Sequence, residues 1–255
     1  MINHIPYPKR CHTSENGIKT AGCRVKNDRV KEEAKNLKQN LPEKGAIVQR
    51  DRETYAIAPH LPGGIMDPSV LRKLADVAEK YGAAALKATS AQRIAIVGLK
   101  EEDLDAAWAD LGMAPGAAIG LCVRSVKFCP GTTFCKQGKQ DAVGLGLKLD
   151  EKYHGMPMPS KFKMAVSGCP NSCSEPAIKD VGIMGTAKGY TLMVGGAAGA
   201  KPRLAEPVAK ELSEEEVLEA VDRIVNFYQN SGTKKRLGSF IESIGLEEFK
   251  KQTGL

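Results

Sequence analysis

Between residues 45 and 111, strand-like runs of apolar residues alternate with stretches of helical spacing. The runs 46–58 and 84–97 are typical of strands, and each is followed by a stretch with helical spacing. The first helix is predicted to begin at Asp67-Pro68, a favourable helix start. Its apolar residues recur three or four positions apart: Val70, Leu71, Leu74, Val77 and Ala78. A second helix is expected over 101–111. This β-α-β-α order predicts a small sheet with helices on one face.

The second half follows a segment rich in glycine, alanine and proline, residues 112–120, which we interpret as a linker. A cysteine-rich region covers 121–146, and alternation predicts a strand at 161–167. Shorter strands are expected at 181–184 and 190–194, before a glycine loop at 195–199. Two helices are predicted to end the chain. The first begins at Ser213, which forms a capping box with Glu216 and precedes apolar residues at helical spacing: Val217, Leu218, Val221, Ile224, Val225 and Tyr228.

Composition places the 255 residues among globular proteins, with 42% hydrophobic and 26% charged residues. The first 44 residues are polar and lysine-rich, and we interpret them as a basic arm with one helical stretch at 28–39. No apolar run suits a secretory signal or a membrane span, so a cytoplasmic protein is expected. The formal charge is +7, but aromatic residues are only 5%, so nucleic-acid binding is not expected.

Four of the seven cysteines form two close pairs, in the pattern C-x5-C followed later by C-x3-C. They are Cys129 with Cys135, and Cys169 with Cys173. Zinc sites favour pairs separated by two to four residues, so the first pair fits zinc poorly. Four thiolates on two distant loops suit a [4Fe-4S] cluster, which is therefore favoured over zinc and over unliganded thiols.

Two segments around these cysteines resemble the signature blocks of the sirohaem-[4Fe-4S] sulfite and nitrite reductases. They are RSVKFCPGTTFCKQGKQD, residues 124–141, and SKFKMAVSGCPNSCSE, residues 160–175. The resemblance covers roughly residues 45–250. It implies an α+β fold, with a ferredoxin-like half-domain at 45–115 and a sirohaem/[4Fe-4S]-binding α/β domain at 116–255 that includes the C-terminal helices.

The resemblance also implies roles for individual residues. The four cysteines would hold the cluster, and Cys173 would bridge it to the sirohaem iron. Lys161 and Lys163, two positions apart on a strand and so on one face, match the lysines that hold the substrate anion. Arg124 matches an arginine directed at substrate or at sirohaem carboxylates. In the half-domain, this chain has Ala91 where many members of the family have an arginine. We expect Arg93 to take the role of that arginine, because residues two positions apart on a strand point to the same face.

Further residues are expected around the cofactor. Arg203 matches an arginine near a haem carboxylate, and Gly195 and Gly196 would let backbone amides approach such carboxylates, unless they are only turn glycines. Lys136, Lys139 and Asn171 are expected to donate hydrogen bonds, although Asn171 also suits a turn between two ligands. Cys11, Cys23 and Cys122 have no counterpart and are interpreted as unliganded thiols.

The expected function is the six-electron reduction of sulfite to sulfide, with catalysis by Lys161, Lys163, Arg93 and Arg124. Reduction of nitrite to ammonia is the alternative, and a [4Fe-4S] electron-transfer protein without sirohaem is another. No flavin or nicotinamide site is evident, so an acidic low-potential donor such as a ferredoxin or flavodoxin is expected, without nucleic acid or membrane as partners. Larger relatives resemble two fused copies of this unit, which favours a homodimer with shared sites over a self-sufficient chain.

Overall fold

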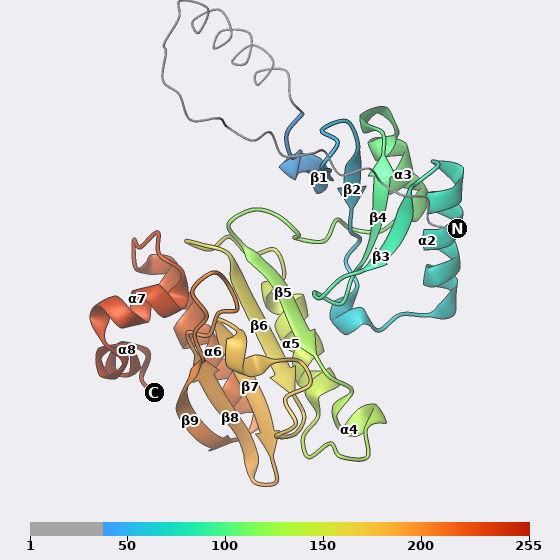
Figure 1. Cartoon of the computed structure of the whole chain (residues 1–255). Helices are drawn as coiled ribbons and strands as arrows, with labels where there is room; N and C mark the ends of the chain where they lie inside the picture. Colours follow the sequence, from blue (N-terminus) through green and yellow to red (C-terminus); the bar gives the residue numbers. More distant parts are fainter. Residues whose placement is uncertain (1–37) are drawn as a thin grey trace, which may run out of the picture. The chain divides into compact units, whose positions relative to one another are not determined.

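The computed structural model describes residues 38–255, which contain two β-sheets flanked by helices (Figure 1). The helix expected at 28–39 lies outside the described residues, apart from its last two positions, which are not helical. Cys11 and Cys23 also lie outside them. None of the helices described has the length and apolar character needed to cross a bilayer.

The first sheet has four antiparallel strands in the order β1-β2-β4-β3. They are β1 (Ala46–Val48), β2 (Tyr55–Ile57), β3 (Ala85–Ala88) and β4 (Ile94–Leu99). Each strand-like run of the sequence is therefore a hairpin, and the expected β-α-β-α order is wrong. The first run turns at Asp51, whose carboxylate accepts backbone hydrogen bonds from Glu53 and Thr54. The second turns between Thr89 and Arg93, where Gln92 has a positive φ of 59°.

Two helices follow these hairpins and cover one face of the sheet, as expected. The helix α2 (Pro68–Lys80) begins at Asp67, whose side chain accepts from the Ser69 N–H at 2.8 Å. The helix α3 (Leu104–Leu111) follows a short 3-10 turn, η3 (Glu101–Asp103). Both contribute to one buried core with β1, β2 and β4. Leu71, one of the apolar residues at helical spacing, lies outside this core and is 47% exposed.

The second sheet has five strands in the order β5-β6-β7-β8-β9. They are β5 (Val123–Phe128), β6 (Phe162–Ser167), β7 (Val181–Thr186), β8 (Gly189–Val194) and β9 (Glu206–Leu212). Pairing is parallel from β5 to β7 and antiparallel from β7 to β9. The strands at β6, β7 and β8 confirm the sequence prediction, whereas β5 and β9 were not predicted.

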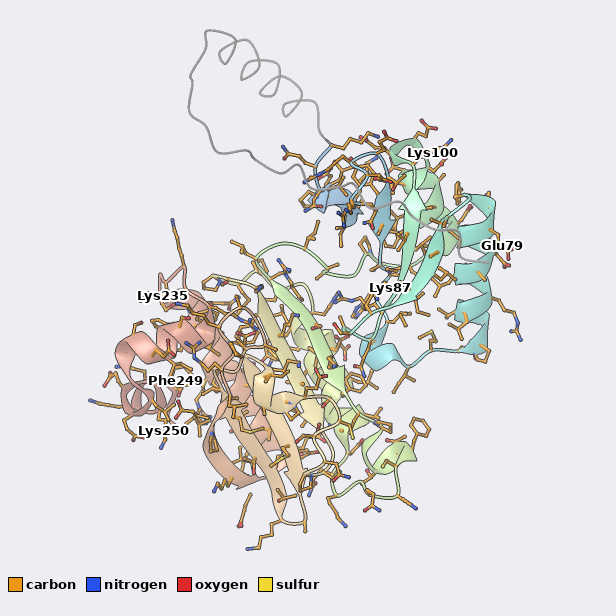
Figure 2. The ribbon with its side chains drawn as sticks, in the orientation of Figure 1. Glu79, Lys87, Lys100, Lys235, Phe249 and Lys250 are labelled. Carbon is orange, nitrogen blue, oxygen red and sulfur yellow. The ribbon has the colours of Figure 1, made fainter. Side chains whose placement is uncertain are left out.

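Five helices belong to this half: α4 (Gly131–Phe134), α5 (Ala142–Tyr153), α6 (Glu214–Asn230), α7 (Leu237–Ile244) and α8 (Leu246–Thr253). The capping box of Ser213 and Glu216 is present at the start of α6. Three helices, rather than two, end the chain, because Gly245, with a φ of +89°, separates α7 from α8. Phe249 of α8 is fully buried, whereas Glu79, Lys87 and Lys100 of the first half are exposed (Figure 2).

The helices α5 and α6 pack on the same face of the second sheet, where Lys152 and Tyr153 of α5 both bond Asp222 of α6. Side chains from alternate positions of β5 and β6 fill the core on that side: Val126, Phe128, Phe162, Met164 and Val166. Because side chains alternate along a strand, Ser125, Lys127 and Lys163 face the opposite side of the sheet. This face carries the candidate site.

Several polar contacts connect the first half to the second, among them those of Gln92 and His60. The Gln92 side chain donates to the Phe128 carbonyl at 2.8 Å and accepts from the Phe128 N–H at 3.1 Å, so it extends the edge of β5. His60 Nε2 lies 2.7 Å from Asp150 Oδ2 on α5. The turn before β4 is therefore held at the edge of the second sheet.

Candidate active site and cysteine loops

The two cysteine pairs begin at the carboxyl ends of neighbouring parallel strands. Cys129 directly follows β5, Cys169 lies two residues after β6, and Phe128 pairs with Val166 in the register of the sheet. Parallel pairing brings these strand ends to the same edge. The Gly168 N–H donates to Cys129 Sγ at 3.1 Å, so the two cysteine loops are in direct contact.

The second loop is closed by two serines. The hydroxyl oxygens of Ser167 and Ser174 lie 2.6 Å apart, and the Ser174 hydroxyl donates to the Val166 carbonyl at 2.7 Å. Ser172 adopts a positive φ of 53° between them, and its N–H donates to the Cys169 carbonyl. These bonds leave Cys169 buried and Cys173 exposed.

The first loop contains the single helical turn α4, and Cys135 follows it at an exposed position. The backbone N–H groups of Lys139 and Gln140 both donate to the Gly168 carbonyl, at 2.8 and 3.0 Å. A Cβ on Gly168 would lie 2.7 Å from the Gln140 carbonyl oxygen and from the Gly131 Cα, so only glycine permits this approach. The two loops therefore pack backbone to backbone.

The donor set fits an iron–sulfur cluster: four cysteine thiols on two touching loops, with a backbone N–H directed at one sulfur. Within residues 38–255, no three His, Cys, Asp or Glu side chains are gathered as closely as a single metal ion requires. The family resemblance also implies a sirohaem, whose carboxylates call for cations. Such cations lie on the face of the second sheet opposite α5 and α6.

Cationic side chains converge on a pocket of about 200 Å³ over β5 and β6. Its lining comes from the half-domain turn, both strands, the segment after Cys173, the glycine loop and the start of α7: Ser90, Ala91, Ser125, Lys127, Lys161, Lys163, Glu175, Ile178, Lys179, Ala198, Gly199 and Arg236. Lys161 and Lys163 line it together, which confirms that they share a face. We call this space the anion pocket.

Two nearly buried lysines of the anion pocket share one carboxylate. Lys127 and Lys179 are 9% and 5% exposed, and each donates its Nζ to Glu175 Oε2 at 3.1 Å. These hydrogen bonds lower the pKa of Glu175. Burial lowers the pKa of Lys179, although its bond to Glu175 opposes the effect.

A buried carboxylate, that of Asp180, orders the other side of the pocket. Asp180 is fully buried and accepts two hydrogen bonds from the Arg236 guanidinium, both at 2.8 Å. Its Oδ2 also accepts from the Lys163 N–H at 2.9 Å. Burial raises the pKa of Asp180, and the bonded Arg236 opposes this shift. One carboxylate thus fixes both the backbone beneath Lys163 and the guanidinium beside it.

Lys163 is a pocket lysine whose surroundings all shift its pKa in one direction. Burial lowers its pKa, and the positive charges of Arg236, Lys179, Lys161 and Arg124 lower it further. An ammonium group in this setting is stabilised strongly by a bound anion. Without one, it releases its proton more readily than an ordinary lysine.

The expectation that Arg93 shares the face of Ala91 is wrong, whereas its expected role at the substrate stays a prediction. Residues 91 and 93 belong to the turn before β4 rather than to a strand, so a separation of two does not restore the face. Ala91 lines the anion pocket, whereas Arg93 is buried elsewhere, where it donates to the Arg124 carbonyl and lies 3.4 Å from His154 Nε2.

Two other arginines do not line the pocket. The Arg124 side chain donates to the Gly120 carbonyl from Nε and Nη2, at 3.0 and 2.9 Å. Arg203 forms an ion pair with Glu242 of α7, and its Nε donates to that carboxylate at 2.9 Å. Their expected contacts with substrate or cofactor stay predictions.

The glycine loop has a packing role as well. Gly195 and Gly196 are buried, and a Cβ on Gly196 would lie 2.7 Å from the Ala177 carbonyl and from the Lys179 backbone. They are therefore not surface-turn glycines. Lys136, Lys139 and Asn171 lie exposed on the two cysteine loops, and their expected cofactor contacts stay predictions.

The sequence analysis missed Lys127, Glu175, Lys179 and Arg236. A signal was present for two of them. Lys127 lies between apolar residues of a strand, and Lys179 lies two residues before β7. A charge within or next to a buried strand commonly has a partner or a ligand. Arg236 lies in a loop far along the chain, where nothing in its neighbours indicates the pocket.

Comparison with known proteins supports both halves of the fold. Residues 47–114 match the nitrite/sulfite reductase ferredoxin-like half domain, and residues 119–255 match the nitrite and sulphite reductase 4Fe-4S domain. The crystal structure of dissimilatory sulfite reductase I superposes with a TM-score of 0.72 at 16% identity, covering 79% of this chain and 69% of that one, which supports the fold.

Two relatives are close in sequence. The assimilatory-type sulfite reductase of Nitratidesulfovibrio vulgaris is 44% identical over 205 residues, which are 80% of this chain and 94% of the relative. The NAD(P)H nitrite reductase of Bacillus subtilis is 41% identical over 202 residues, but these are only 25% of that longer protein. With both domains matched in order, this chain belongs to the nitrite and sulfite reductase family.

Proposed function

We propose that the protein reduces sulfite to sulfide in a six-electron reaction that uses a [4Fe-4S] cluster and sirohaem. The observation that carries this proposal is the anion pocket. Five cations line it, and one of its residues, Glu175, lies two positions after Cys173. A site for a small oxyanion therefore adjoins the loop that bears two of the cluster cysteines.

Cys129, Cys135, Cys169 and Cys173 would hold the cluster, and Cys173 would be the thiolate shared with the sirohaem iron. When bound, the cluster would pass on electrons from the donor, and the sirohaem would supply a metal able to bind the sulfur or nitrogen atom of the substrate. Arg203, Asn171, Lys136 and Lys139, with the backbone at Gly195 and Gly196, stay candidates for contacts with the macrocycle.

Lys161 and Lys163 bind the substrate oxygens, and the neighbouring cations neutralise charge that develops as those oxygens leave as water. Lys163 suits proton delivery as well as binding, because burial and adjacent cations lower its pKa. In this proposal, Arg124 and Arg93 reach the substrate only through a change of side-chain direction, because both now donate to backbone carbonyls.

Sulfite is favoured over nitrite because a pocket of many cations suits a dianion, and because the chain spans nearly the whole of the sulfite reductase relative. Nitrite is the second candidate, and the 41% identity to a nitrite reductase supports it. The electrons are expected from a separate acidic protein of low potential, docking on a chain with a formal charge of +7.

The test is anaerobic purification followed by a spectrum, iron and sulfide analysis, and steady-state assays with a reduced viologen. A sirohaem spectrum with higher kcat/KM for sulfite than for nitrite is expected. The reverse preference would assign nitrite. A cluster without sirohaem, together with no reduction of either anion, would indicate an electron-transfer protein instead.

A further inference from the structure

Glu175 is the only carboxylate among the described residues that line the anion pocket. It faces five cations there: Lys127, Lys161, Lys163, Lys179 and Arg236. Asp180 lies directly behind Arg236 and is paired with it, so it reduces the pocket charge but does not line the cavity. Adding the formal charges gives +5 for the cations, −1 for Glu175 and −1 for Asp180, a net charge of +3.

The fold builds the position of Glu175. Its backbone is left-handed, with φ 60° and ψ 49°, and its N–H donates to the Ser172 carbonyl at 2.8 Å. The next residue begins the 3-10 turn η4 (Pro176–Ile178). After this turn, the Lys179 ammonium group donates a hydrogen bond to the Glu175 carbonyl at 3.1 Å. The carboxylate is thus aimed at Lys127 and Lys179 by a strained residue within a tightly bonded turn.

The three side chains differ sharply in exposure. The Lys127 and Lys179 side chains are 11% and 7% exposed, whereas that of Glu175 is 53% exposed. An incoming anion therefore meets the carboxylate at the solvent side of two lysines that have little access to water. Glu175 competes with the anion for these lysines and also subtracts one charge from the pocket.

We propose that Glu175 determines the preference of the pocket between doubly and singly charged oxyanions. The inference rests on the proposed function and concerns the substrate class of the same site. The attraction between a charge and an anion is proportional to the charge of the anion. Removing the Glu175 charge must therefore change the binding free energy of a dianion about twice as much as that of a monoanion, so the fold-change for sulfite is the square of that for nitrite.

The experiment measures Kd for sulfite and for nitrite by calorimetry on the oxidised holoenzyme without reductant, well above neutral pH where sulfite is fully ionised. Glu175→Gln is expected to lower Kd for sulfite about tenfold and for nitrite about threefold. Glu175→Asp keeps the charge and is expected to keep the ratio of the two Kd values. Glu242→Gln, which removes an equal charge outside the pocket, is expected to change neither Kd by more than about twofold.

A second pair of variants gives the opposite change and does not disturb Lys127 or Lys179. Gly199 lines the pocket, is exposed, and has no atom within 4 Å of where its Cβ would lie. Gly199→Asp adds a carboxylate there, and Gly199→Asn is the uncharged control of the same shape. Relative to Gly199→Asn, Gly199→Asp is expected to weaken sulfite binding about tenfold and nitrite binding about threefold.

Haem and iron contents are measured for every variant, so that an effect on a sirohaem carboxylate is distinguished from an effect on the free anion. Equal fold-changes for the two anions, or none in both variant pairs, would overturn the role of Glu175. If the charge-dependent binding is seen but neither anion is reduced in the assays above, the proposed function fails while the pocket assignment stands.

Discussion

Lys163 differs from an ordinary surface lysine because it is half-buried among cations and its backbone N–H bonds a buried carboxylate. The lowered pKa means that its positive charge is lost at a lower pH than the usual 10.5 of lysine. Because the pocket attracts anions through this charge, anion affinity should fall on the alkaline side earlier than ordinary lysines would allow.

We expect KM for the anion to rise with pH below the ordinary lysine pKa in the unchanged protein. In Lys163→Arg the rise should move to higher pH, since a guanidinium group stays charged throughout this range. Steady-state KM profiles for both proteins measure this. An identical alkaline limb in the variant would show that another group is responsible.

Cys173 is an exposed thiol held at the end of a loop that Ser167 and Ser174 close. Replacing it with serine is expected to remove most of the bound iron and sulfide together with the haem spectrum, because a cluster needs all four thiolates. Cys122 is the matched control: it lies outside the cysteine loops, and its Sγ contacts the Ile119 carbonyl at 3.6 Å. Cys122→Ser should keep the full iron content; normal iron content in Cys173→Ser would refute the ligand assignment.

At the scale of elements, the site depends on how the glycine loop packs against the segment that follows Cys173. Gly196 contacts the backbone at Ala177 and Lys179 so closely that any Cβ would lie 2.7 Å from three of its atoms. This contact keeps Lys179 and the loop at one side of the anion pocket. The strands supply the rest of it, since alternation on β5 and β6 separates the core residues from Lys127 and Lys163.

Gly196→Ala is therefore expected to destabilise the fold by about 1–3 kcal/mol, because the crowded neighbours are backbone atoms that cannot move independently. Gly199→Ala is the control from the same loop, where a Cβ meets nothing within 4 Å. Thermal denaturation should show a lower Tm for the first variant and an unchanged Tm for the second. Equal Tm values would mean that the loop adjusts freely.

At the scale of the molecule, the two halves meet at a cluster of polar groups that do not line the anion pocket. The rings of His60 and His154 stack with centroids 3.5 Å apart, while His60 bonds Asp150 and Arg93 lies beside His154. Burial lowers the pKa of His154 to about 4, and the neighbouring His60 and Arg93 add to the shift.

His154 binds a proton less readily in the folded state than in the unfolded state. The free energy of unfolding is therefore unaffected by this group above pH 6.5, and it decreases as the pH falls from 6.5 towards about 4. Over that interval we expect Tm to fall by several degrees more in the unchanged protein than in His154→Asn, which has no titrating ring. Calorimetry at a series of pH values measures the difference. Parallel Tm curves would exclude His154 as the cause.

Assembly is the second question at this scale. The sequence argument favoured two subunits that share sites, yet Lys161 and Lys163 line a pocket with Glu175 of their own chain, close to the Cys173 loop. We therefore expect that mixing Cys173→Ser with Lys163→Met chains restores no activity, even after subunit exchange is confirmed by mass spectrometry. Recovery of activity in the mixture would indicate a site shared across a dimer.

Several features of this protein follow from the sequence by itself because they depend on residues close together in the chain. The spacing of Cys129, Cys135, Cys169 and Cys173 favours an iron–sulfur cluster, and the two sequence blocks around them carry the resemblance to the family. The capping box of Ser213 needs only its own first turn. Likewise, the separation of Lys161 and Lys163 by two places them on one face of a strand.

Only the tertiary structure decides the rest. Strand pairing and the helix α7 bring Ser90, Lys127, Lys179 and Arg236 to one pocket from positions spread over more than half of the chain. The turn before β4, with Gln92 at a positive φ, sends Arg93 away from that pocket although its distance in sequence suits a strand. Short-range patterns determine the elements, whereas the charge of the pocket depends on which distant side chains the fold brings together, and no local pattern encodes that.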